Sequence, residues 1–237
     1  MTASSTVRAA GPGEAPQLVR LALFVAACGS VLPLLAWVYG LGSFASFALV
    51  VGAPLVLAVL GTTLWLDRTG RWPKTRAAIL AGAIGGLVGT LGYDLFRVPF
   101  VYTTGLQLLA PIESYGVLLL DAPSSSTLTA FAGWAYHFVN GIGFGIAWAV
   151  VARGRPWLWG VGWAMFLETM TIISPFAGTY GLIAGGQVQV LPIAIAYAAH
   201  VPYGVAVGLF AQHADARAAE ARSLLRAPVA LLVGVLA

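Results

Sequence analysis

Six apolar stretches, each of about 20 residues, dominate this sequence and limit the folds that it can adopt. A helix needs about 20 mostly apolar residues to cross the hydrocarbon core of a bilayer, and helices satisfy their own backbone hydrogen bonds there. The spans that we expect are residues 18–39, 44–66, 77–98, 129–151, 157–176 and 190–212. The sequence therefore predicts an all-α, polytopic membrane helix bundle with six transmembrane spans.

The composition agrees with a chain that lipid surrounds. Hydrophobic residues make up 59% of the 237 positions and charged residues only 8%, whereas soluble domains contain about 25% charged residues. So few charges cannot cover a water-facing surface of this size. The net charge of +4 comes mainly from basic residues between the spans, which is typical of a topology signal. We expect the lipid bilayer as a partner and no nucleic acid, and the sequence favours no oligomeric state.

The basic residues also predict the orientation of the chain. With a cytoplasmic N-terminus, eleven of the twelve lysines and arginines lie on the cytoplasmic side, and Arg97 is the exception. We therefore expect a multi-pass protein of a bacterial plasma membrane with both termini in the cytoplasm. Residues 1–17 are expected to form a disordered cytoplasmic tail. Residues 213–237 are expected to form an amphipathic basic segment followed by an apolar tail too short to cross the membrane.

The fourth and sixth expected spans share a pattern of polar and small residues. A His-x3-Gly-x3-Gly sequence begins at His137 in one and at His200 in the other. The spans before them each contain one acid, Asp94 in the third and Glu168 in the fifth. Each pair of consecutive spans then forms a hairpin with an acid on one helix and a histidine on the other. Two such hairpins predict a parallel repeat about an axis along the membrane normal.

These polar residues fall at similar depths in the outer half of the bilayer. A charged side chain at mid-membrane costs at least about 2.5 kcal/mol, so we expect them to face one another or a wet cavity. In this hypothesis Glu168 and His137 are catalytic and exchange a proton. The residues expected to bind a substrate or ligand are Asp94, Arg97, Asn140, His200 and Tyr203.

Two alternatives for the cofactor stay open. Two histidines and two carboxylates, namely His137, His200, Glu168 and Asp94, have the chemistry to bind a divalent transition metal, although no compact motif such as His-Glu-x-x-His is present. Each histidine can instead hydrogen-bond a carboxylate and hold two helices together. Haem held by the two histidines has no further support in the sequence.

The leading functional hypothesis is a polar pocket that binds a small or lipophilic ligand, with acid–base or metal-assisted chemistry as an open addition. The rival is a proton- or cation-coupled transporter or transporter subunit, which also needs acids inside the membrane. A third hypothesis is a structural membrane protein without a ligand. Glu113, in the outer connection over residues 99–128, is expected to be solvated, and its closing over the pocket as part of a lid is the alternative.

The histidine-containing helices also suggest a family. Their His-x3-Gly-x3-Gly patterns, together with Asn140-Gly141 and Phe144-Gly145, resemble small bacterial inner-membrane families of four to seven spans. The resemblance covers residues 77–210. These families have no agreed activity, so the resemblance implies a helical membrane fold and carries no catalytic residue to this chain.

Overall fold

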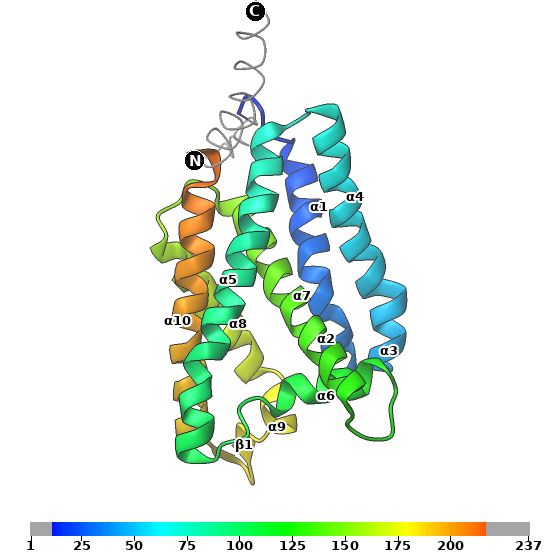
Figure 1. The fold of residues 1–237 in the computed structure, drawn as a ribbon, viewed down its shortest axis with the longest axis vertical. Coiled ribbons are helices and arrows are strands. Elements are labelled where there is room, and N and C mark those ends of the chain that lie inside the picture. Colours follow the sequence, from blue (N-terminus) through cyan, green and yellow to red (C-terminus); the bar gives the residue numbers. More distant parts are fainter. Residues whose placement is uncertain (1–10, 217–237) are drawn as a thin grey trace, which may run out of the picture.

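The computed structural model describes residues 11–216 and is helical apart from one short β-hairpin (Figure 1). Five helical segments are long and apolar enough to cross a membrane: Gln17–Val38, Phe44–Thr69, Pro73–Thr104, Thr127–Ala152 and Val190–Gln212. They confirm an all-helical chain of the membrane type. Residues 1–10 of the predicted tail, and residues 217–237 of the predicted C-terminal segment, lie outside the described residues.

Prolines divide the first two membrane-length segments into shorter helical pieces. A proline lacks the N–H that continues a helix, so the hydrogen-bond pattern changes in the turn before it. Pro33 follows a 3₁₀ turn, and Pro54 follows a π turn. The pieces are α1 (Gln17–Cys28), η1 (Gly29–Val31) and α2 (Leu32–Val38), then α3 (Phe44–Phe47), η2 (Ala48–Gly52) and α4 (Ala53–Thr69).

The rest of the chain forms the helices that surround the site. They are α5 (Pro73–Thr104), α6 (Ala110–Leu119), α7 (Thr127–Ala152), α8 (Leu158–Ile173), α9 (Phe176–Thr179) and α10 (Val190–Gln212), with the hairpin of β1 (Ile183–Ala184) and β2 (Gln187–Val188) before α10. Helix α5 continues through Pro99 to Thr104, beyond its predicted end at Val98. The connection after it contains α6, which the sequence did not predict as a helix.

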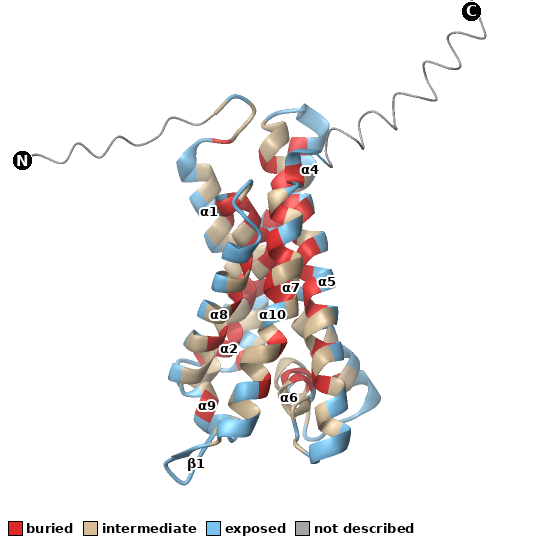
Figure 2. Cartoon of the chain, turned by 90° about the vertical axis from the view of Figure 1, so that its left-hand side faces the viewer, coloured by how far each residue is buried: buried red, intermediate tan, exposed pale blue. Residues whose placement is uncertain are grey.

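Glycines allow the central helices to approach closely in two helix pairs, α5 with α7 and α8 with α10. A Cβ added at Gly82 of α5 would lie 2.5 Å from the carbonyl oxygen of Gly145 in α7. A Cβ added at Gly160 of α8 would lie 2.5 Å from that of Gly204 in α10. Small residues at such contacts are a usual device of helices in membranes. Figure 2 shows the buried residues along the middle of the bundle, with exposed residues on its outer surface.

Helix α8 is shorter than the span predicted over residues 157–176. Its 16 residues extend about 24 Å at 1.5 Å per residue, less than the hydrocarbon core of about 30 Å. The helix ends because Ser174 adopts an extended conformation before Pro175, as residues before proline tend to do. The sixth crossing is therefore not among the membrane-length helices of the described part of the chain and stays a prediction.

One end of the bundle carries the charged connections and the first described residues. Arg153, after α7, pairs with Glu14 and Asp215. The backbone N–H of Ala15 donates to Thr75 Oγ1 at 2.9 Å. Residues 11–17, which we expected to belong to a disordered tail, are thus held against α5 and α7.

Candidate functional site

A cavity of about 500 Å³ lies at the other end of the bundle, near α6 and α9. Helices α2, α5, α6, α7, α8 and α10 contribute to its wall, which is mostly apolar. Six of the seven predicted site residues line it: Arg97, His137, Asn140, Glu168, His200 and Tyr203. The expected convergence of polar groups from four helices around one cavity is therefore present in the structure.

Asp94 is the predicted site residue that does not line the cavity. It is buried behind the wall, where its Oδ1 accepts a hydrogen bond from Arg97 Nη2 at 2.6 Å. Both of its carboxylate oxygens lie 3.1 Å from His137 Nε2. Its hydrogen-bonding capacity is directed at these two side chains, so Asp94 positions the wall and does not face a ligand.

Arg97 completes this first cluster and ties it to the outer connection. Its Nη1 donates to the carbonyl oxygen of Leu108 at 2.8 Å, and its guanidinium carbon lies 4.1 Å from the ring centre of Tyr93. The residue is only 5% exposed. Asp94 supplies the negative charge that a buried arginine requires, so the first acid–histidine pair also contains its own cation.

The second pair joins α8 and α10 on the cavity wall. His200 Nδ1 lies 3.4 Å from Glu168 Oε2 and 2.9 Å from the carbonyl oxygen of Ala196. Only 3% of Glu168 is exposed. Within the described residues, no lysine or arginine forms an ion pair with Glu168. This carboxyl group therefore faces the cavity without a fixed cation.

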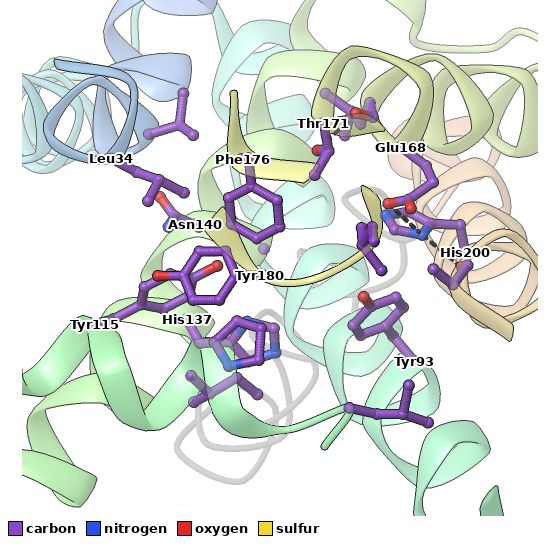
Figure 3. A pocket seen from close by; sticks show the side chains of 18 of the residues that line it. Leu34, Tyr93, Tyr115, His137, Asn140, Glu168, Thr171, Phe176, Tyr180 and His200 are labelled. Atoms are coloured by element: carbon purple, nitrogen blue, oxygen red, sulfur yellow. Dashed lines mark hydrogen bonds and ion pairs between the residues drawn. The ribbon is translucent and has the colours of Figure 1, made fainter. Parts of the chain in front are cut away.

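Tyr93 lies between the two pairs. Its ring centre is 4.7 Å from that of His200 and 6.1 Å from that of His137. Figure 3 shows His137 and Asn140 on one side of the cavity and Glu168 and His200 on the other. Tyr93 was not among the predicted site residues, although it precedes Arg97 by one helical turn and so occupies the same face of α5.

The acids and histidines do not gather into a metal site. Within residues 11–216, no group of three or more histidine, cysteine, aspartate or glutamate side chains is placed to hold a metal ion. The predicted ligand set of Asp94, His137, Glu168 and His200 is instead divided into the two pairs. The geometry gives the metal hypothesis no support.

Helix α6 and the segment after α9 form the outer wall. A Cβ at Gly116 would meet the backbone carbonyl of Thr129, so α6 lies directly on α7. Ser114 Oγ and the Tyr180 hydroxyl lie 2.6 Å apart and join the two wall segments. Burial raises the pKa of Tyr180 and raises that of Tyr115 well above its ordinary value. Both phenols therefore stay protonated at neutral pH.

Glu113 takes no part in this wall, contrary to the lid hypothesis. Its side chain is exposed, while its neighbours Ile112 and Tyr115 line the cavity. Helix α6 turns its apolar face inward because its glycine contact with α7 fixes its rotation. The connection does cover the cavity, but it does so with apolar side chains.

Asn140 is the most direct sign of an incomplete hydrogen-bond network. The residue is 8% exposed and lines the cavity, and its Oδ1 atom has no hydrogen-bond partner. Most buried polar side-chain atoms in proteins have a partner. Tyr203, also predicted as a ligand residue, instead uses its hydroxyl to donate to the Gly141 carbonyl oxygen at 2.8 Å.

Comparisons of the chain with protein-family models, curated proteins and solved structures gave no match. The case for a function therefore rests on the geometry and chemistry of the cavity.

Proposed function

We propose that this chain is an integral membrane protein that binds a small lipophilic molecule in the cavity between α5, α7, α8 and α10. The unpaired Oδ1 of Asn140, on the wall of a mostly apolar cavity of about 500 Å³, carries this proposal. Ligand sites are typically apolar cavities of about 300–1,000 Å³ with a few polar groups. A ligand donor at Asn140 would remove an unsatisfied acceptor that costs about 1–3 kcal/mol.

We place the cavity in the outer half of a bacterial plasma membrane, in a bundle of six spans with cytoplasmic termini. The concentration of charged connections at the end opposite the cavity supports this orientation. Helix α8 together with α9 would complete the sixth crossing. The matched glycine contacts of the α5–α7 and α8–α10 hairpins support a parallel repeat. The family resemblance belongs to the same proposal.

Glu168 and His137 are the groups through which acid–base chemistry would act on a bound ligand. Both line the cavity, and Asp94 holds His137 in place through its Nε2 atom. A histidine oriented by a carboxylate is a common arrangement for proton exchange. Binding comes first in this proposal, and chemistry is the extension that a bound ligand would allow us to test.

Co-purification with matched tryptophan variants tests the proposal. Ala196 lines the cavity on α10, and Ala194 is exposed on the same helix. The proteins are purified in detergent, and the lipophilic molecules that they retain are quantified by mass spectrometry. Ala196→Trp should fill the cavity and lose a molecule that the wild type and Ala194→Trp both retain. Equal retention by both variants, or no molecule enriched over an unrelated membrane protein, would contradict the proposal.

A second candidate function, proton- or cation-coupled transport, is favoured by the burial of Glu168 without a lysine or arginine partner in the part of the chain that the structure describes. Acids inside membranes without a fixed counter-ion often carry protons or cations in transporters. Proteoliposomes with an internal pH-sensitive dye test this candidate under an imposed potential. Proton flux above that of empty vesicles, abolished by Glu168→Gln and retained by Glu113→Gln, would support transport over simple binding.

A further inference from the structure

We propose that the cavity selects a lipophilic amine, whose protonated head group binds at Glu168. This inference rests on the proposed binding function and adds the chemical class of the ligand. It follows from the charges, the hydroxyl groups and the histidines of the cavity wall.

Among the lysines and arginines of residues 11–216, none forms an ion pair with the Glu168 carboxyl group. Arg97 is neutralised by Asp94 at 2.6 Å and uses its other terminal nitrogen on the Leu108 carbonyl oxygen. Glu168 has only the half-buried His200 at 3.4 Å. An ionised Glu168 would thus give the cavity one uncompensated negative charge, and a buried charge requires a partner. A cationic ligand would supply it.

Four hydroxyl groups of the wall have already used their hydrogens. A hydroxyl has one hydrogen to donate and two lone pairs to accept with. These four donate to backbone carbonyl oxygens at 2.7–3.0 Å, namely Thr90 to Gly86, Thr171 to Leu167, Ser174 to Thr171 and Tyr203 to Gly141. Their remaining capacity is that of acceptors. A ligand that approaches them must therefore bring donors.

The histidines present acceptors for the same reason. A neutral imidazole has one donor nitrogen and one acceptor nitrogen. His137 directs Nε2 at the oxygens of Asp94, and His200 directs Nδ1 at the Ala196 carbonyl oxygen. Each of these nitrogens faces an acceptor and therefore bears the hydrogen. In the neutral form of each ring the opposite nitrogen is an acceptor, like Oδ1 of Asn140.

The donors that remain on the wall are neutral apart from Arg97, whose charge Asp94 balances. They are the hydroxyls of Tyr93 and Tyr115, the side-chain amide of Gln107 and the unpartnered Nε of Arg97, and the carboxylate of Glu168 is the group of the wall that would attract a positive charge. The aromatic ring of Tyr203 adds a face that attracts cations, whereas the ring of Tyr93 already has the Arg97 guanidinium over it. Because the wall is mostly apolar and lacks a metal-ligand cluster, an ammonium group with an apolar body fits it better than a bare metal ion.

Three probes with the same chain and different head groups test the inference. Octylamine, octanol and octanoate are compared by equilibrium dialysis against the whole protein in a non-ionic detergent at neutral pH. We expect octylamine to bind about tenfold or more tightly than octanol, because charge-assisted hydrogen bonds are the stronger ones. Glu168→Gln should abolish this preference and leave octanol binding unchanged, while Glu168→Asp should keep the preference. Glu113→Gln, which alters an exposed acid outside the cavity, is the matched control.

The outcomes separate this inference from the proposed function. Equal binding of octanol and octylamine would contradict the proposed preference for an amine, while the proposed ligand-binding function would be retained. Tightest binding of octanoate would also overturn it and would assign the site to an anion at Arg97. If no probe binds and Ala196→Trp changes no retained molecule, the proposed function fails as well. The comparison of probes on the wild type holds even if a Glu168 variant does not fold.

Discussion

The two acid–histidine pairs of the cavity contain the same kinds of groups but differ in their charge balance. Asp94 contacts both His137 and a buried arginine, so its charge is matched inside the protein. Among the described residues, the ion-pair contact of Glu168 is with His200, and that histidine also directs its nitrogen at a backbone carbonyl oxygen. The first pair is therefore complete without a ligand, whereas the second is not.

The same hairpin pattern therefore gives two results: a charge-balanced pair in the first hairpin and a carboxyl group on the cavity wall in the second. Both hairpins pack through glycines, and both place an acid near a histidine. Arg97, three residues after Asp94, changes the outcome in the first hairpin because it draws the carboxylate away from the cavity. In the second hairpin, Thr171 follows Glu168 by three residues and donates to its own helix backbone. Glu168 consequently remains on the cavity wall.

Removal of the Arg97 side chain should lower the stability of the protein more than any other change proposed here. Arg97→Leu leaves the buried Asp94 without its cation and breaks the bond to Leu108. Loss of one partner of a buried ion pair typically costs about 3–5 kcal/mol. Thermal unfolding in detergent should show this destabilisation. Asp94→Asn introduced together with Arg97→Leu should recover most of the lost stability, and an unchanged unfolding temperature in the single variant would show that the first pair is not charge-balanced in this way.

Replacement of a glycine at a helix contact by alanine should cause an intermediate loss of stability. The loss should be similar in the two hairpins. Gly86 in α5 would place a Cβ against the backbone of α7, and Gly160 in α8 would do so against α10. Alanine at either position should destabilise the protein by about 1–3 kcal/mol, the usual cost of overpacking. Gly61→Ala is the control, because nothing lies within 4 Å of an added Cβ there. Unequal losses at Gly86 and Gly160 would weaken the proposed repeat.

The sequence predicted the polar residues of the site because lipid leaves them few alternatives. Ionisable groups such as Glu168 and His200 must find partners inside a membrane bundle, so their convergence follows from composition and spacing. The prediction that Asp94 lines the cavity was wrong, since hydrophobicity patterns do not show which of two neighbouring charges will bind the other. The contact with Arg97 at 2.6 Å decides this.

The outer wall could not be predicted in the same way. Tyr115 and Tyr180 lie in connections whose positions depend on tertiary contacts. Examples are the close packing of Gly116 against α7 and the hydrogen bond between Ser114 and Tyr180. Helix α8 also ended earlier than its apolar stretch suggested, although Pro175 was a visible signal for a helix boundary. Apolar runs indicate where a helix can extend, whereas local breakers determine where it ends.

Neutralising Glu168 should have the smallest effect on stability and the most informative sign. Glu168→Gln keeps the shape of the side chain and removes a buried carboxyl group that has no lysine or arginine partner in the described chain. The free energy of unfolding should change by about 1 kcal/mol or less, or increase, because an unpaired buried charge is unfavourable. Asp94→Asn, measured beside it, should be clearly more destabilising, since it leaves Arg97 buried without its anion. If instead the two amide variants lose equal stability in thermal unfolding, both acids are structural, and the distinction between a completed pair and a ligand-ready pair does not hold.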